Sequence, residues 1–212
     1  MIELLISAFV TFFVVIDPPG CAPIFASLTD GTSAAHQRRM AYRSVMVATG
    51  VLLFFALLGE PLLKALGISL DAFRIAGGVM LFLIAIDMVF EKRTERRENR
   101  AKGVAEGAGG QLEAEDISVF PMGIPMIAGP GTIASVMLLT AKSSGWTETA
   151  AVLAALGAVL VMTLGALLAA GPIMKKLGRN LEAMITRLLG VILAALAAQF
   201  VIDGIRRSFD LV

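Results

Sequence analysis

The sequence predicts an all-α membrane protein in which six transmembrane helices form two inverted three-helix repeats, with spans one and four broken near the bilayer midplane. Three observations predict this fold class: the composition, six long apolar runs, and motifs that recur on both sides of a charged linker. The chain has 212 residues, of which 57% are hydrophobic and 17% charged, with a mean hydropathy of +0.83. An average soluble domain has about 25% charged residues, so the composition excludes an ordinary soluble enzyme.

The charge balance and the cysteine content exclude further classes of protein. The 18 basic and 17 acidic residues give a net charge of +1, and many of them lie in one mixed stretch, so no basic face is left for a nucleic acid. One cysteine and one histidine cannot build a disulfide framework, a zinc cluster or a Cys/His catalytic pair. We therefore expect no nucleic acid, no metal and no cofactor.

Six apolar runs are long enough to cross a bilayer, which requires about 18 residues or more. They cover residues 3–28, 42–63, 72–90, 117–140, 149–171 and 184–205. The first run is not expected to be a cleaved signal peptide, because no Lys or Arg precedes Arg38 and such peptides begin with a basic segment. The sequence therefore predicts six helices that all remain in the mature chain.

A charged linker separates spans three and four. Residues 91–118 contain six basic and seven acidic residues around a Gly/Ala-rich middle, a composition typical of a solvated and partly disordered segment. A regulatory or phosphate-binding role for its arginines is the alternative. The predicted organisation is a first repeat over 1–90, a cytoplasmic linker over 91–116 and a second repeat over 117–212.

The distribution of Lys and Arg predicts the orientation in the membrane, because basic residues are retained on the cytoplasmic side. One side carries twelve of them, namely Arg38, Arg39, Arg43, Lys92, Arg93, Arg96, Arg97, Arg100, Lys102, Lys175, Lys176 and Arg179. The other side carries five, namely Lys64, Arg74, Lys142, Arg206 and Arg207, and Arg187 is ambiguous. Both termini are therefore expected outside the cytoplasm.

Motifs on the two sides of the linker repeat each other. PLLKALGISLDA at 61–72 aligns with PIMKKLGRNLEA at 172–183, at an offset of 111 residues. Two further pairs follow in the same order: Pro19-Gly20 with Pro130-Gly131, and, after a two-residue insertion, Arg74–Gly77 with Arg187–Gly190. Because each half contains three spans, the second half enters the membrane in the opposite sense. This pattern predicts an inverted repeat, which is common among secondary transporters.

Spans one and four each contain a helix-breaking motif, DPPGCAP at 17–23 and PMGIPMIAGPGT at 121–132. Proline removes an amide donor, and the residue before it is pushed out of helical geometry. Unwound backbone at that depth is tolerated where it is buried in protein or lines a polar cavity. One such motif could serve packing or bending alone, but two at matching positions of inverted halves favour a binding site. The candidate substrate-binding residues are Asp17, Pro18, Pro19, Gly20, Pro23, Gly129, Pro130, Gly131 and Thr132.

Asp17 is the only ionisable residue near the centre of any predicted span, and such residues are functional candidates by default. Its alternative role is that of a cap on the broken helix, which Asp favours, and the two roles are compatible. Thr132 could cap the second half-helix in the same way. The first amides of each half-helix favour a carboxylate, whereas Asp17 favours an ammonium group, so a small zwitterion fits the predicted site.

Four segments carry a resemblance to a known family: DPPGCAPIFASLT, IPMIAGPGTI, RIAGGVMLFLIAIDM and LLGVILAALAAQFVIDGI. They are similar to segments of the MarC family of bacterial and archaeal inner-membrane proteins, and the resemblance covers the whole chain except the linker. It implies translocation of small neutral amino acids such as glycine or alanine. It also implies a location in the inner membrane, so the termini that the Lys and Arg distribution places outside the cytoplasm are expected on the periplasmic side.

The resulting hypothesis is a secondary transporter that works by alternating access around the paired broken helices, with proton coupling left open. The alternatives are a structural or regulatory membrane subunit and an exporter of another small solute. An enzyme is not expected, because Asp17 has no acid/base partner at its depth in the spans. The expected partners are a small-molecule substrate and the lipid bilayer, and the sequence leaves a homo-oligomer open.

Overall fold

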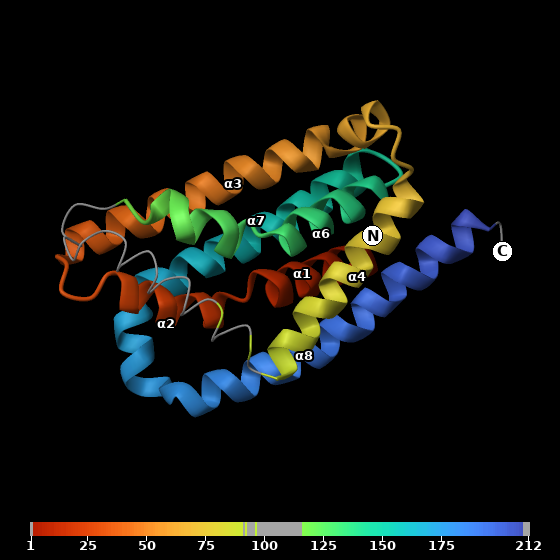
Figure 1. The fold of residues 1–212 in the computed structure, drawn as a ribbon. Helices are drawn as coiled ribbons and strands as arrows, with labels where there is room; N and C mark the ends of the chain where they lie inside the picture. Colours follow the sequence, from red (N-terminus) through yellow and green to blue (C-terminus); the bar gives the residue numbers. More distant parts are fainter. Residues whose placement is uncertain (1, 91, 93–95, 97–115, 210–212) are drawn as a thin grey trace.

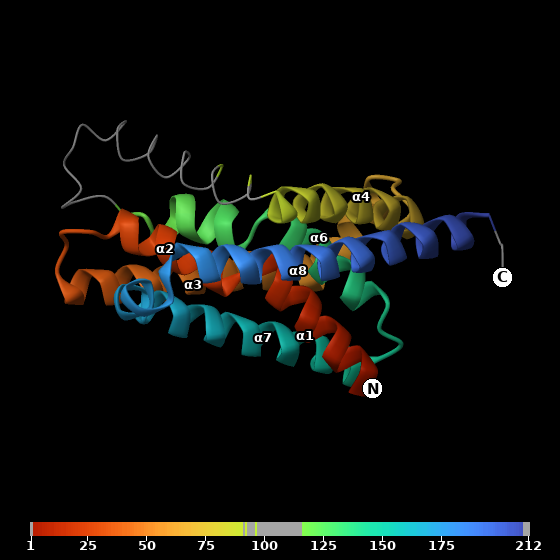
Figure 2. The same cartoon turned by 90° about the horizontal axis from the view of Figure 1, so that it is seen from below.

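The structure, a computed structural model, describes residues 2–90, 92, 96 and 116–209, and over residues 172–182 it describes the backbone alone. Most of the predicted linker over 91–116 thus lies outside the described residues. The described part of the chain is an elongated bundle of helices without strands (Figure 1). Seen from below, the same helices lie in more than one layer (Figure 2).

The first span consists of two helices, α1 (Ile2–Ile16) and α2 (Pro18–Leu28), which follow one another almost in line (Figure 1). Only Asp17 between them leaves the right-handed helical conformation. Pro18 and Pro19 occupy the first positions of α2, where a helix amide would have no partner and proline is tolerated. The DPP motif therefore interrupts this span at a single residue, a smaller interruption than the sequence predicts.

The next two helices are long and apolar, α3 (Ala34–Ala65) and α4 (Leu70–Val89). Each begins with a serine cap: Ser33 accepts a hydrogen bond from the His36 amide, at 3.2 Å, and Ser69 accepts one from the Ala72 amide, at 3.1 Å. Such caps satisfy an amide that the helix leaves unpaired. Gly67 turns the chain between the two helices with φ +70°, a conformation that glycine adopts without steric cost.

The fourth predicted span is an irregular segment, η1 (Ser118–Ile127), followed by a regular helix, α6 (Pro130–Ala141). Phe120 and Ile124 are extended, with φ −131° each, and each precedes a proline with which it forms a cis peptide bond. A residue before proline is disfavoured in the α region, which explains why η1 is not a continuous α-helix. The axes of η1 and α6 differ by 54°.

The last two helices are α7 (Trp146–Leu168) and α8 (Ala170–Ser208), and only Ala169 separates them. Residues 172–183 lie between the predicted fifth and sixth spans, and their backbone is helical and belongs to the start of α8. The first turns of α8 run across one end of the bundle before the helix turns along it, and both views agree on this (Figures 1 and 2). A proline near a helix start does not prevent the helix.

Five helical stretches of the described chain are long and apolar enough to cross a membrane, and a sixth is added if η1 and α6 count as one span. The all-α membrane class predicted from the sequence is confirmed at this level. Apolar side chains such as Leu53, Phe54 and Leu57 of α3 are exposed on the outside of the bundle, as expected for a surface that faces lipid.

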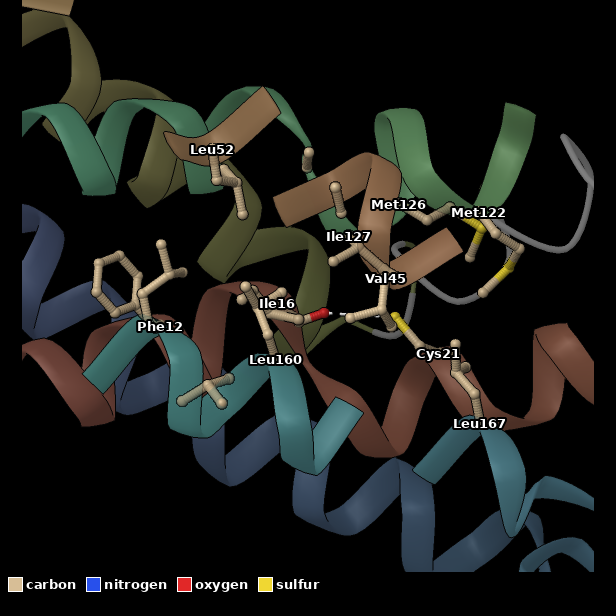
Figure 3. Close-up of a cluster of buried hydrophobic side chains, with 14 of the residues drawn as sticks. Phe12, Ile16, Cys21, Val45, Leu52, Met122, Met126, Ile127, Leu160 and Leu167 are labelled. Atoms are coloured by element: carbon tan, nitrogen blue, oxygen red, sulfur yellow. Dashed lines mark hydrogen bonds between the residues drawn. The ribbon is translucent and has the colours of Figure 1, made fainter. Parts of the chain in front are cut away.

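Buried apolar side chains form two clusters. The larger one joins α1, α2, α3, η1, α6 and α7 and contains Phe12, Ile16, Leu52, Met122 and Leu160 (Figure 3). The smaller one joins α1, α4 and α8, with Val14, Val15, Leu81, Ala85, Met88, Leu193 and Ala197. The start of α2 and the end of η1 both lie against the larger cluster, so the two broken segments meet a common core.

Helix α4 packs side by side with the C-terminal half of α8 (Figures 1 and 2). Glycines permit the close approach: a Cβ added to Gly78 would lie 2.9 Å from the Ala197 carbonyl oxygen, and one added to Gly190 would lie 3.1 Å from the Ala85 carbonyl oxygen. Gly204 approaches Ile75 in the same way. Since later residues of α8 meet earlier residues of α4, the two helices are antiparallel.

Candidate functional site

Asp17 caps the start of α2. Its backbone has φ +60° and ψ +66°, in the left-handed region that Asp and Asn tolerate better than other side chains. Its carboxylate Oδ1 accepts a hydrogen bond from the Gly20 amide at 3.1 Å, and only 2% of the residue is exposed. The backbone bonds continue across the break, because the Asp17 amide donates to the Phe13 carbonyl and the Cys21 amide donates to the Asp17 carbonyl, both at 3.0 Å.

Gly20 is required beside this carboxylate. A Cβ added to Gly20 would lie 2.8 Å from Cγ of Asp17, closer than non-bonded carbon atoms can approach. Any larger residue would therefore displace the Asp17 side chain from its hydrogen bond. Asp17 therefore caps α2 in the structure, which is the alternative role considered for it from the sequence.

Apolar side chains fill the space beside the first break. Cys21 is fully buried with its Sγ 3.5 Å from the Ile16 carbonyl oxygen, and side chains from α3, η1 and α7 surround it, among them Val45, Met122 and Leu167 (Figure 3). Three cavities of the described part of the chain are considered below, and none of them is lined by Asp17, Pro18, Pro19, Gly20 or Pro23. Pro19 and Pro23 are half-buried and the other three are buried.

The start of α6 forms the second break. Gly129 precedes the helix without a side-chain cap, and Pro130 is its first residue. The Thr132 hydroxyl donates to the Ile127 carbonyl at 2.9 Å, so it satisfies a carbonyl that the break leaves without a helical partner. The capping role considered for Thr132 is not found, because its hydroxyl donates across the break and α6 has no side-chain cap.

A cavity of about 180 Å³ adjoins the start of α6. Four of the predicted site residues line it, namely Gly129, Pro130, Gly131 and Thr132. The remaining lining comes from Val15, Ile84, Asp87, Arg96, Pro125 and Met126. Its volume lies below the about 300–1,000 Å³ typical of pockets for drug-sized ligands, so it suits a small solute.

The two breaks lie close together, because the end of α1 touches the start of α6. A Cβ added to Gly131 would lie 3.3 Å from Cγ1 of Val15 and 2.5 Å from Cδ1 of Ile84. Val15 precedes Asp17 by two residues and also lines the cavity. The structure therefore brings four residues of the second predicted set to a cavity, whereas the first predicted set is not part of its lining.

Asp87 and Arg96 form an ion pair at the edge of this cavity. The Asp87 side chain is 19% exposed and that of Arg96 is 70% exposed. Asp87 is not among the site residues predicted from the sequence, because it lies toward the end of its span. The signal that could have found it is that Asp87 is the only acidic residue in the predicted span 72–90.

A second ion pair lies where η1 begins. Arg43 of α3 contacts the carboxylate of Asp116 at 2.6 Å, and Asp116 also accepts hydrogen bonds from the hydroxyl and the amide of Ser118. The hydrogen bond from the Ser118 hydroxyl is the main reason why the pKa of Asp116 is lowered from its ordinary value of 3.8, and Arg43 and Arg39 add to the effect while burial opposes it. Asp116 therefore ties η1 to α3.

The other two cavities lie at opposite ends of the bundle. One, of about 280 Å³, lies between α2, the start of α3 and the junction of α7 and α8, and includes Gln37 and Arg38. The other, of about 320 Å³, lies between α1, α6 and α8, and includes Glu3, Lys142 and Asp203. Within the described residues, no three His, Cys, Asp or Glu side chains are grouped in a way that could hold a metal ion.

A bundle of five or six membrane-spanning candidates with an apolar outer surface defines a multi-pass integral membrane protein. The chain belongs to the MarC family of integral membrane proteins, whose family model matches residues 2–209. The resemblance found in the sequence is therefore confirmed over almost the whole chain.

Relatives at 31–36% identity support the same membership. The chain is 36% identical to a UPF0056 membrane protein of Methanocaldococcus jannaschii, over 97% of each chain, and 35% identical to the UPF0056 membrane protein YvbG of Bacillus subtilis, over 99% of this chain and 97% of that one. It is 32% identical to the UPF0056 inner membrane protein YhgN of Escherichia coli, over 95% and 96% of the two chains. No solved structure matches the chain.

Proposed function

We propose that the protein is a secondary transporter of small neutral amino acids, such as glycine and alanine, or of similar small zwitterions. In this proposal it works by alternating access around broken helices in spans one and four. The observation that carries the proposal is the cavity at the start of α6, which is lined by Gly129–Thr132 and by one carboxylate. Helix starts of this kind inside a membrane bundle are typical substrate sites of transporters.

The pattern of helix contacts supports an inverted repeat. If α1 and α2 correspond to η1 and α6, α3 to α7, and α4 to α8, each major contact should have a counterpart. The contact of α1 with α7 is matched by that of η1 with α3. In the same way, the contact of α2 with α7 is matched by that of α6 with α3, and the contact of α2 with α8 by that of α6 with α4. The contacts of α4 with α8 and of α3 with α7 map onto themselves.

The chemistry of the cavity favours a small zwitterion. Proline at position 130 has no amide hydrogen, and the next two amides of α6 belong to the first turn, which has no acceptors within the helix. These amides and the helix dipole favour a carboxylate. A carboxylate side chain in the same cavity favours a positive charge. A substrate with one charge of each sign satisfies both ends.

Asp17 is the proposed site of proton coupling. It is 2% exposed and lies two residues from Val15, which lines the cavity. Asp17→Asn keeps the shape and the capping oxygen but cannot exchange a proton. We expect this variant to fold and to exchange substrate, while a pH gradient no longer accelerates net uptake.

The test is exchange transport by purified protein in liposomes. Unlabelled alanine inside is exchanged for labelled alanine or glycine outside, which requires no driving ion and so tests the site in either direction of transport. Gly131→Val is expected to abolish exchange, because the added side chain would fill the space beside Ile84 where the substrate approaches the α6 amides. Its melting temperature in detergent controls for folding.

Two outcomes separate this proposal from its alternatives. If wild-type protein exchanges neither amino acid, a structural or regulatory subunit becomes the better account. If it exchanges another small solute instead, the protein is a transporter of a different substrate class.

A further inference from the structure

Asp87 lies where a carboxylate could meet the ammonium group of a substrate, the role that the sequence predicts for Asp17. Both are acidic residues within predicted spans, but Asp17 is buried, is hydrogen bonded to Gly20 and lines none of the three cavities described above. Among the described residues, Asp87 is the only carboxylate in the lining of the cavity at the start of α6. It lies on α4, three residues after Ile84, which contacts Gly131.

The present partner of Asp87 is easily replaced. Arg96 is 70% exposed, so water solvates its guanidinium when the pair is broken, and ion pairs with such exposed groups contribute little to stability. Asp87 is 19% exposed and is fixed on α4. A carboxylate that is largely buried needs a positive or hydrogen-bonding partner, and a substrate ammonium group can take over that role from Arg96.

We infer that Asp87 binds the ammonium group of the substrate, an assignment that rests on the transport function proposed above. The substrate carboxylate then faces the first turn of α6 at Gly131 and Thr132, on the opposite wall of the same cavity. Arg96 competes with the substrate for Asp87. The site therefore selects solutes that carry an ammonium group and rejects analogues of the same size that carry a hydroxyl group there.

Alanine and lactate provide the discriminating pair of probes, because lactate has a hydroxyl group where alanine has its ammonium group. A hydrogen bond between charged groups contributes about 1.5–3 kcal/mol, which corresponds to about a tenfold to hundredfold change in affinity. Wild-type protein is expected to bind alanine at least about tenfold more tightly than lactate by this estimate.

The experiment measures the half-saturating concentration of alanine in the liposome exchange assay. Asp87→Asn is expected to raise it about tenfold or more, and Asp87→Glu, which keeps the charge, is expected to recover much of the loss. Lactate should raise the melting temperature of wild type and of Asp87→Asn by the same amount, because it has no ammonium group for Asp87 to bind. Arg96→Gln is expected to lower the half-saturating concentration, because the competitor of the substrate is removed.

Asp203→Asn is the matched control, since Asp203 also lies near a helix end and accepts a hydrogen bond from a neighbour, Gln199, at 2.7 Å. It should exchange alanine as the wild type does. Exchange by Asp87→Asn at the wild-type half-saturating concentration would overturn the assignment and leave the transport function standing. If Asp87→Asn fails to fold, the Arg96→Gln variant provides the test. A higher half-saturating concentration of alanine in Arg96→Gln than in wild type would overturn the assignment of Asp87. A wild type without exchange overturns both proposals.

Discussion

At the scale of single residues, the geometry at Asp17 shows how one side chain can shape a whole span. The two prolines after it have no amide hydrogens, so Gly20 provides the first amide that a cap can reach. Asp17 accepts that hydrogen bond and is 2% exposed. The sequence alone left capping and substrate binding open for this residue, because both roles use the same carboxylate.

Gly20→Ala should destabilise the protein. Its Cβ would lie 2.8 Å from Cγ of Asp17, so the cap would be displaced, and the expected cost in the free energy of unfolding is about 1–3 kcal/mol. The measurement is thermal unfolding in detergent. The matched control is Gly157→Ala in α7, where nothing lies within 4 Å of the added Cβ and alanine should be neutral or stabilising by up to about 1 kcal/mol. Equal melting temperatures for the two variants would contradict this account.

Asp116→Asn should reduce stability in a pH-dependent way. The pKa of Asp116 is lowered in the folded protein, so the carboxylate stabilises the folded state at pH values above its ordinary pKa of 3.8, and this contribution is lost as the pH falls through the lowered pKa. Because both partners are partly exposed, the expected difference from wild type is below about 1 kcal/mol at pH 7. Melting curves at pH 7 and near pH 3 test this, and a difference that grows on acidification would refute it.

At the scale of the elements, sequence reasoning predicted helix identity well and helix ends poorly. The predicted spans 42–63 and 72–90 correspond to α3 and α4, because apolar length is what a bilayer requires. Residues 172–183 lie between two predicted spans but are helical in the structure, because polar and charged residues can continue a helix that leaves the apolar region. Propensity alone does not separate a loop from a helix there.

The sequence indicates local features of the candidate site but not how distant segments pack around it. Proline and glycine can be located in the sequence as points where a helix is interrupted, since their backbone effects are local. Which break adjoins a cavity depends on packing between distant segments, such as Val15 and Ile84 against Gly131. Asp87 was missed because its position relative to α6 arises only from the tertiary fold.

Gly78→Ala should weaken the interface between α4 and α8. The added Cβ would lie 2.9 Å from the Ala197 carbonyl oxygen and 3.0 Å from the Val201 amide nitrogen, and backbone atoms cannot move aside as a side chain can. The expected loss is about 1–3 kcal/mol. Gly165→Ala in α7 serves as control, because its Cβ would meet nothing within 4 Å. The measurement is thermal unfolding of both variants. If Gly78→Ala is as stable as the Gly165→Ala control, the interface between α4 and α8 is loosely packed.

At the scale of the whole molecule, both termini of the described chain lie at the same end of the bundle, and α4 runs from that end toward the other (Figure 1). An even number of membrane crossings produces this arrangement. The sequence adds the direction, because the side predicted to face the cytoplasm carries twelve Lys and Arg residues and the other side carries five.

We therefore expect both termini outside the cytoplasm and the linker inside it. Reporters that are active in only one compartment, fused at either terminus or within residues 103–110, test this orientation. Activity of a cytoplasmic reporter at the C-terminus would show that the orientation is reversed. The same result at only one terminus would instead show an odd number of crossings, with η1 and α6 forming a re-entrant segment.

The single-residue interruption at Asp17 has a thermodynamic consequence for span one. The hydrogen bonds on both sides of Asp17 are kept, so the left-handed torsions of this one residue are the whole departure from helical backbone between α1 and α2. The left-handed conformation costs an L-residue about 1–2 kcal/mol, and the bond from Gly20 offsets part of this cost. The net cost of the interruption is therefore only a few times the thermal energy. A solute whose binding favours other torsions at Asp17 by that amount would change the direction of one half of the span relative to the other.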